Sequence, residues 1–90
     1  MRVLLAEDEK ALSKALVTIL ERNNYSVDAV YDGESALEYL ENDNYDIAIL
    51  DIMMPKIDGL TVLKNVRKRN NLIPILLLTA KSEVDDKVEG

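Results

Sequence analysis

Cysteine and histidine are both missing from this chain of 90 residues, and each absence excludes a class of chemistry. Without cysteine there is no disulfide framework and no thiolate metal site. Without histidine the chain cannot carry a Ser-His-Asp or Cys-His catalytic site, bind a metal through imidazole or form phosphohistidine. Any metal site in this chain must therefore rely on oxygen ligands.

Long apolar runs and clustered positive charge are also scarce. The longest apolar runs are far too short to span a membrane, and the N-terminal MRVLLAEDE lacks a signal-peptide pattern, so we expect a cytoplasmic protein. The net charge of -6 argues against nucleic-acid binding by this segment, because phosphate contacts need clustered lysine and arginine. No glycine-rich phosphate loop is present, so nucleotide binding is not expected either.

Four short apolar runs alternate with stretches of helical periodicity, in a chain that is 48% hydrophobic. The predicted strands are Arg2 to Ala6, Tyr25 to Val30, Ile47 to Leu50 and Ile75 to Leu78. The predicted helices are Lys10 to Asn23, Glu34 to Glu41 and Leu60 to Arg69, with a fourth beginning near Glu83. This alternation predicts one α/β domain over residues 1–90, with a parallel sheet and helices on both faces.

Each predicted helix should bury one apolar face against the sheet. The residues expected to point inward are Ala11, Leu12, Ala15, Leu16, Ile19 and Leu20 in the first helix, Ala36, Leu37 and Leu40 in the second, and Leu60, Leu63 and Val66 in the third. Asp32 and Asp58 precede the second and third helices and are plausible N-caps.

Acidic and hydroxyl side chains follow three of the predicted strands. Glu7 and Asp8 come after the first, Asp51 after the third and Thr79 after the fourth. If the first and third strands are neighbours, the three carboxylates converge at the carboxyl edge of the sheet. Mutual repulsion would raise the pKa of at least one of these carboxylates, and a bound divalent cation would relieve the repulsion. Oxygen-only ligands suit Mg²⁺.

Taken singly, each of these signals has an ordinary structural explanation. The run from Glu7 to Glu9 can be a solvated acidic turn, Asp51 can cap a loop, and Thr79 can end a strand through its β propensity. Only their combination at one sheet edge indicates a site.

Three stretches resemble the receiver domain of two-component response regulators. They are LLAEDE at residues 4–9, DIAILDIMMPKIDG at 46–59 and PILLLTA at 74–80, and their spacing agrees over the whole chain. The stretch YDGESAL at 31–37 is similar to the usual start of the family's second helix. The resemblance implies a flavodoxin-like sheet with strand order 2-1-3-4-5.

The resemblance also implies the roles of the acidic residues. Asp51 matches the phosphoacceptor, which attacks a phosphoryl group carried on a histidine of a partner kinase. Asp8 and Asp51 match direct Mg²⁺ ligands, together with the backbone carbonyl of Met53, and Glu7 matches the second acidic position. The chain would then be a signalling module, not a turnover enzyme.

Two further positions match the family, and one expected residue does not. Thr79 matches the switch hydroxyl that turns toward the phosphoryl oxygens, and Ala80 matches the small residue beside it. Receivers continue through a fifth helix and a fifth strand that ends in a lysine pairing with the phosphoryl group, whereas Lys81 follows the wrong strand. We therefore expect a truncated receiver with order 2-1-3-4 and impaired phosphorylation, whose full-length parent can carry a DNA-binding domain.

The strand from Ile75 to Leu78 would then be an exposed apolar edge. Such an edge is a template for another chain, so we expect a homodimer or a strand-exchanged oligomer. The competing expectation is a loosely packed monomer.

Two other functions remain open from the sequence. One is a structural or assembly fragment with an inert site. The other is an aspartate-nucleophile phosphohydrolase resembling the haloacid dehalogenases, which place Asp-x-Asp directly after the first strand. This chain has Glu7-Asp8-Glu9 there, which disfavours the hydrolase.

Overall fold

The computed structural model describes residues 1–78, in which four strands alternate with three helices. The elements are β1 (Arg2–Ala6), α1 (Lys10–Arg22), β2 (Ser26–Val30), α2 (Gly33–Asn42), β3 (Ile47–Asp51), α3 (Gly59–Lys68) and β4 (Ile75–Leu78). The predicted alternation is confirmed: β1 and β4 have the predicted bounds, and the other elements differ from them by one residue at one or both ends. The helix expected near Glu83 lies outside the described residues.

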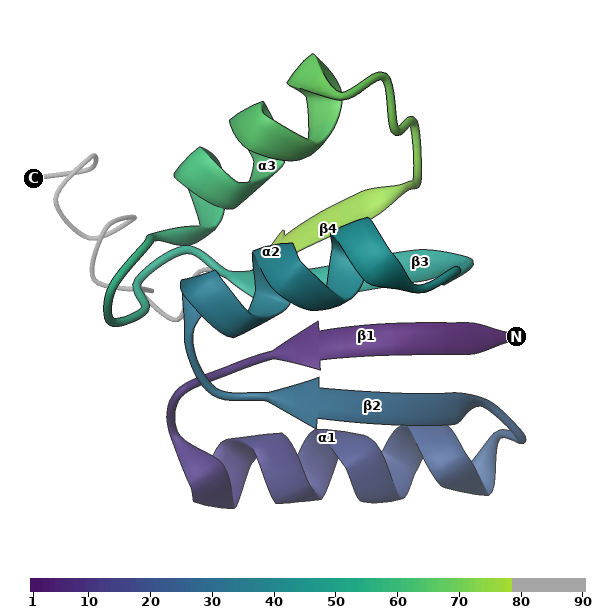
Figure 1. The fold of residues 1–90 in the computed structure, drawn as a ribbon. Helices are drawn as coiled ribbons and strands as arrows, with labels where there is room; N and C mark the ends of the chain where they lie inside the picture. The colour runs from purple at the N-terminus through teal and green to yellow at the C-terminus, as the bar shows by residue number, and fades with distance from the viewer. Residues whose placement is uncertain (79–90) are drawn as a thin grey trace, which may run out of the picture.

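All four strands are parallel and lie in the order β2-β1-β3-β4 (Figure 1). This confirms the predicted order of the four strands. The chain steps from β1 outward to β2 and then returns to place β3 on the other side of β1. Residues after β1 and β3 therefore leave neighbouring strands at the same edge, which is where open α/β sheets bind ligands.

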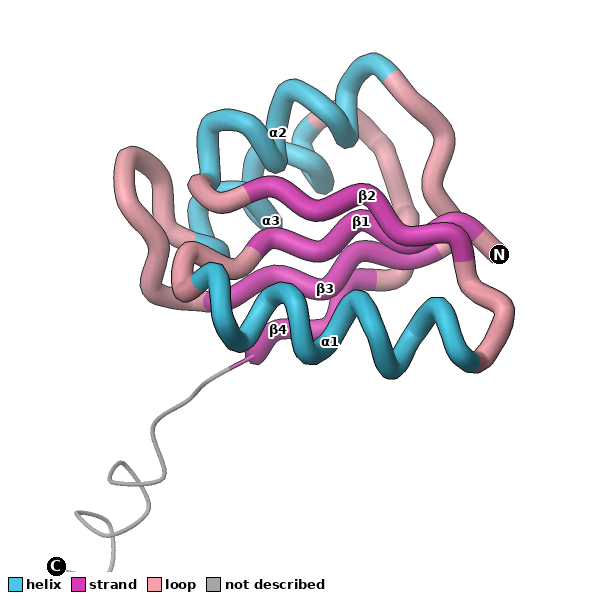
Figure 2. The backbone as a smooth tube through the Cα atoms, turned by 90° about the horizontal axis from the view of Figure 1, so that it is seen from below, coloured by secondary structure: helices cyan, strands magenta, loops and turns pink. Residues whose placement is uncertain are grey.

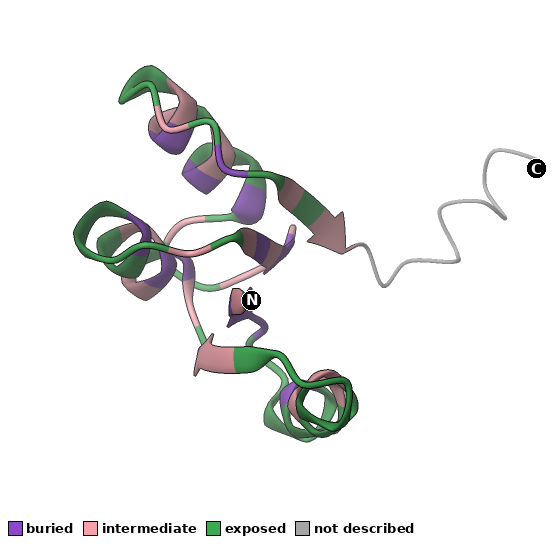
Figure 3. Cartoon of the chain, turned by 90° about the vertical axis from the view of Figure 1, so that its right-hand side faces the viewer, coloured by how far each residue is buried: buried purple, intermediate pink, exposed green. Residues whose placement is uncertain are grey.

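Helices cover both faces of the sheet. Helices α2 and α3 lie on one face, and α1 lies on the other, beside β2 and β1 (Figures 2 and 3). The main core fills the space between the sheet and the α2–α3 layer, and it consists of Leu4, Ala6, Val30, Ala36, Leu40, Ala48, Leu50, Val62, Val66 and Ile73. Strand β1 is central, and its Val3 and Leu5 are buried as well. Both of its faces are therefore covered, as is usual for an interior strand of a parallel sheet.

Helix α1 buries less of its apolar face than its periodicity predicted. Within the described part of the chain it packs mainly against β2, and to a smaller extent against β1. Leu12 and Ile19 are 36% and 55% exposed, and Ser13 is the buried residue of this helix. Part of the apolar face of α1, including Leu12 and Ile19, is therefore not covered by residues 1–78.

Helix α3 turns a different face inward than predicted. Val62 and Val66 are buried together with Gly59, whereas Leu60 is 45% exposed. The prediction that Leu60 packs inward was wrong. The spacing of apolar residues allowed two neighbouring stripes, and the close packing of Gly59 against β3 selects the one through Val62.

A polar cluster ties together the amino ends of the strands. The hydroxyl of Tyr45 donates a hydrogen bond to Asp28 Oδ2 at 2.7 Å, and the Arg2 guanidinium pairs with the same oxygen at 3.0 Å. Arg2 also lies over the Tyr45 ring, 4.6 Å from its centroid. Burial, followed by the hydrogen bond to Asp28 and its charge, raises the pKa of Tyr45, so the phenol stays a donor.

No helix within residues 1–78 has the length and hydropathy needed to cross a membrane.

Candidate functional site

Three carboxylates meet at the carboxyl ends of β1 and β3. Glu7 and Asp8 directly follow β1, and Asp51 is the last residue of β3. One carboxylate oxygen from each of the three lies within 4.8 Å of the others. Glu7 and Asp51 are only 4% and 8% exposed, whereas Asp8 faces solvent. The fold thus brings Asp51 to Glu7 and Asp8, from which the sequence separates it by more than 40 positions.

The two buried carboxylates accept backbone hydrogen bonds that fix their positions. Glu7 Oε2 accepts from the Glu9 amide at 2.9 Å, and Asp51 Oδ1 accepts from the Met53 amide at 3.3 Å. Burial, together with the negative charge of Asp51, raises the pKa of Glu7. The cluster is therefore in electrostatic conflict, because ionised carboxylates this close repel one another.

This donor set fits a hard divalent cation. The converging ligands are carboxylate oxygens, which suit Mg²⁺, and the cation would offset both the burial of negative charge and the repulsion from Asp51 that raise the pKa of Glu7. A hollow of about 450 Å³ opens beside the cluster and leaves room for retained water or a phosphoryl group. Its lining is Asp8, Ile52, Met53, Met54, Pro55 and Asp58.

The loop from Ile52 to Asp58 forms the outer wall of this hollow. At its end, Asp58 caps α3 by accepting a hydrogen bond from the Thr61 amide at 2.7 Å, and this bond lowers the pKa of Asp58. The next residue, Gly59, donates to the Ile52 carbonyl at 2.8 Å. A Cβ on Gly59 would lie 2.4 Å from the Asp51 carbonyl oxygen, so only glycine allows this approach. Sequence reasoning missed this contact, which no local pattern reveals.

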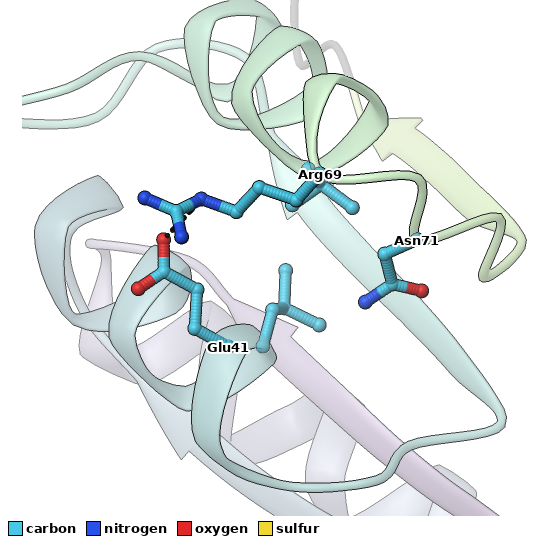
Figure 4. Close-up of a pocket in the computed structure, with 5 residues that line it drawn as sticks. Glu41, Arg69 and Asn71 are labelled. Carbon is cyan, nitrogen blue, oxygen red and sulfur yellow. Dashed lines mark ion pairs between the residues drawn. The ribbon is translucent and has the colours of Figure 1, made fainter.

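A second hollow lies at the opposite end of the sheet, between the carboxyl ends of α2 and α3 (Figure 4). It has a volume of about 260 Å³ and is lined by Leu40, Glu41, Val66, Arg69 and Asn71. Arg69 Nε pairs with Glu41 Oε2 at 3.0 Å across it. This ion pair links α2 to α3, and the hollow holds none of the three converging carboxylates.

Comparison with known proteins assigns the family. The family model described as "Response regulator receiver domain" matches residues 3–90. The chain belongs to this family. Among its relatives, this receiver is 49% identical over 90 residues to the transcriptional regulatory protein DltR of Streptococcus agalactiae. That alignment covers the whole chain but 40% of DltR, so the receiver spans less than half the length of this curated relative.

Solved receiver structures share the fold. The response regulator TrrA of Thermotoga maritima, in complex with Mg²⁺-BeF, matches with a TM-score of 0.86 and 38% identity, over 97% of this chain and 76% of that one. The receiver domain of the sensor histidine kinase PA1611 of Pseudomonas aeruginosa has a magnesium ion coordinated in its active site cleft. It matches with a TM-score of 0.87 and 29% identity, over 97% of this chain and 73% of that one.

The remaining predicted site residues of this receiver follow β4. Leu78, the last residue of β4, is the register partner of Asp51 on β3. Thr79 and Ala80 come next in the sequence and lie outside the described residues, as does Lys81.

Proposed function

We propose that this receiver accepts a phosphoryl group on Asp51 from a phosphohistidine of a partner kinase. The convergence of Glu7, Asp8 and Asp51 within 4.8 Å, at the carboxyl edge of a receiver fold, is the observation that supports this most strongly. An Asp51 oxygen forms a bond to phosphorus while the P–N bond to histidine breaks, and its electron pair returns to the imidazole ring. The lack of histidine in this chain means that the donor is a separate molecule or segment.

Glu7, Asp8 and Asp51 would hold Mg²⁺ together with the Met53 backbone carbonyl. Bound there, the ion would supply positive charge that compensates the negative charge on the phosphoryl oxygens during transfer. Two solved receivers of the same fold support this: TrrA is in complex with Mg²⁺-BeF, and the PA1611 receiver has a magnesium ion coordinated in its active site cleft. In this chain, the Met53 amide donates to Asp51 Oδ1 and so orients the carboxylate toward Glu7 and Asp8 in the cluster.

We propose Thr79 as the switch hydroxyl and Ala80 as the small residue that lets it approach. The support is positional: Leu78 pairs in register with Asp51, and Thr79 is the next residue in the chain. A phosphoryl group on Asp51 is a dianionic acceptor that would draw this hydroxyl toward the phosphoryl oxygens. Thr79→Ala should leave adduct formation measurable while abolishing the conformational response seen by amide shifts.

Incubation with a small phosphoryl donor and Mg²⁺, followed by intact mass measurement, tests the central proposal. The wild type should gain one phosphoryl group, and Asp51→Asn should gain none. Asp43→Asn is the matched control, because Asp43 is an exposed aspartate outside the carboxylate cluster and the hollow, and this variant should be phosphorylated normally. An adduct on Asp51→Asn would overturn the assignment. Rapid multiple turnover of the donor would favour the hydrolase instead, and no adduct on the wild type would favour the inert fragment.

The expected surroundings of the receiver follow from the same assignment. We place it in the cytoplasm with a histidine kinase as its partner, and with no nucleic-acid or membrane contact through this acidic segment. Relatives such as DltR are named transcriptional regulators and are more than twice as long, so a DNA-binding output would belong to parts beyond this match.

We also propose that β4 mediates pairing with a second copy of the chain, as a homodimer or strand-exchanged oligomer. Within residues 1–78, β4 pairs only with β3, and Leu76 on β4 is 53% exposed. An unpaired apolar edge is a template for another strand. Sedimentation should show a dimer or larger species that Leu76→Glu converts to monomer, whereas Leu72→Glu, on an 80% exposed residue before β4, should not. A compact wild-type monomer at high concentration would refute this.

A further inference from the structure

The loop from Ile52 to Asp58 is held by two different helices. The Gly59 amide of α3 donates to the Ile52 carbonyl at 2.8 Å and fixes the start of the loop. The Gly33 amide, at the first residue of α2, donates to the Pro55 carbonyl at 3.3 Å and fixes its middle. The same Pro55 carbonyl accepts from the Ile57 amide at 2.8 Å, which closes a tight turn around Lys56.

This turn needs external support. Lys56 has a φ of 71°, in the left-handed region that residues with a side chain seldom adopt. Its ion pair with Glu34 is 3.5 Å long and exposed on both sides, so it contributes little to holding the loop. The close contact with α2 is therefore the stronger constraint on the path of the loop.

Gly33 is the point at which α2 and the loop touch most closely. A Cβ on Gly33 would lie 1.8 Å from the carbonyl oxygen and 2.6 Å from the carbonyl carbon of Ile57. Both are backbone atoms, so no side-chain rotation could make room. Gly33 does not have a positive φ, so glycine is required here for space and not for its backbone freedom.

We propose that Gly33 is a positioning residue for the metal and phosphoryl site, acting through the loop that carries Met53. The inference rests on the proposed function, because it assigns the Met53 carbonyl to the metal. Gly33 lies outside the cluster of Glu7, Asp8 and Asp51 and has no side chain with which to bind the metal. A side chain at position 33 pushes the Pro55–Ile57 turn away from α2 and displaces the Met53 carbonyl from the carboxylates.

The test compares Mg²⁺ affinity in the wild type, Gly33→Ala and Asp32→Ala by titration of backbone amide shifts. Gly33→Ala should bind Mg²⁺ about tenfold more weakly, the size typical of losing a group that orients a metal ligand. Alanine is the better helix former, so α2 propensity cannot cause this loss. Asp32→Ala is the matched control: it removes the cap on the Ser35 amide and destabilises α2, but adds no atom against the loop.

The outcomes are distinct. Equal Mg²⁺ affinity in Gly33→Ala and the wild type, or equal losses in Gly33→Ala and Asp32→Ala, would overturn the positioning role. Absence of Mg²⁺ binding by the wild type would instead overturn the proposed function. If Gly33→Ala does not fold, the wild-type titration decides: the Gly33 and Ile57 amides should shift with the same midpoint as Met53, and a Gly33 amide that stays unmoved refutes the coupling.

Discussion

Replacing Glu7 with glutamine should make the metal-free receiver more stable while weakening its response to Mg²⁺. Glu7 is 4% exposed and shares a 4.8 Å cluster with Asp8 and Asp51, and its pKa is raised by burial and by the charge of Asp51. Glutamine has nearly the same shape. Its oxygen can keep the hydrogen bond from the Glu9 amide, and its NH₂ group can donate to Asp51, so a repulsion becomes an attraction.

The size of the effect follows from the geometry. Two unit charges 4.8 Å apart repel by about 3.5 kcal/mol at an effective dielectric constant of about 20 and by about 0.9 kcal/mol in bulk water. The cluster opens to solvent on the side of Asp8, so we expect a gain of about 1–2 kcal/mol near neutral pH. For a domain of this size, each kcal/mol raises Tm by about 4–8 °C.

The gain should also depend on pH. Below the ordinary pKa of 4.5, Glu7 is protonated in both the folded and the unfolded chain, so charge repulsion costs the wild type nothing. As the pH rises through the raised pKa of the folded state, the wild type loses stability and Glu7→Gln does not. The difference in Tm between the two should therefore be small in acid and largest at neutral pH.

Thermal unfolding followed by circular dichroism, with chelator and with millimolar Mg²⁺, measures both effects. Mg²⁺ should raise the Tm of the wild type more than that of Glu7→Gln, because each tenfold loss of affinity removes up to about 1.4 kcal/mol of ligand stabilisation. Glu9→Gln is the control, since it removes a neighbouring exposed charge outside the cluster. A metal-free Glu7→Gln no more stable than Glu9→Gln would show that the carboxylates do not repel as argued.

Three further changes test the rest of the structure by urea unfolding. Leu50→Ala empties a fully buried site in the core and should cost about 3 kcal/mol, and a loss below about 1 kcal/mol would contradict the packing. Tyr45→Phe removes the donor to Asp28 but keeps the ring, and should cost about 1 kcal/mol. Asp58→Ala should be less stable than the wild type above pH 3.8. This difference in stability should disappear as the pH falls through the lowered pKa of Asp58 in the folded state. A difference that does not change with pH would argue against the capping role of Asp58.

The parallel sheet could be anticipated from connectivity, whereas the strand order, and with it the meeting of the carboxylates, was implied by the resemblance to receiver domains. Short apolar runs joined by helical stretches give parallel strands, and the residue after each strand then lies at one edge. Glu7 and Asp51 were therefore expected near each other without any distance being known, and the N-cap roles of Asp32 and Asp58 followed from local preference.

The sequence alone determined which elements form and which acidic residues share an edge, because periodicity and chain order are local or topological properties. Only the tertiary structure decided which face of α3 turns inward, leaving Leu60 exposed, and why Gly33 and Gly59 must lack a side chain. These outcomes depend on backbone atoms of Ile57 and Asp51 that lie close in space but belong to other segments. Close contacts between segments that are distant in the sequence cannot be predicted from a local sequence pattern, because they depend on how the folded chain brings those segments together.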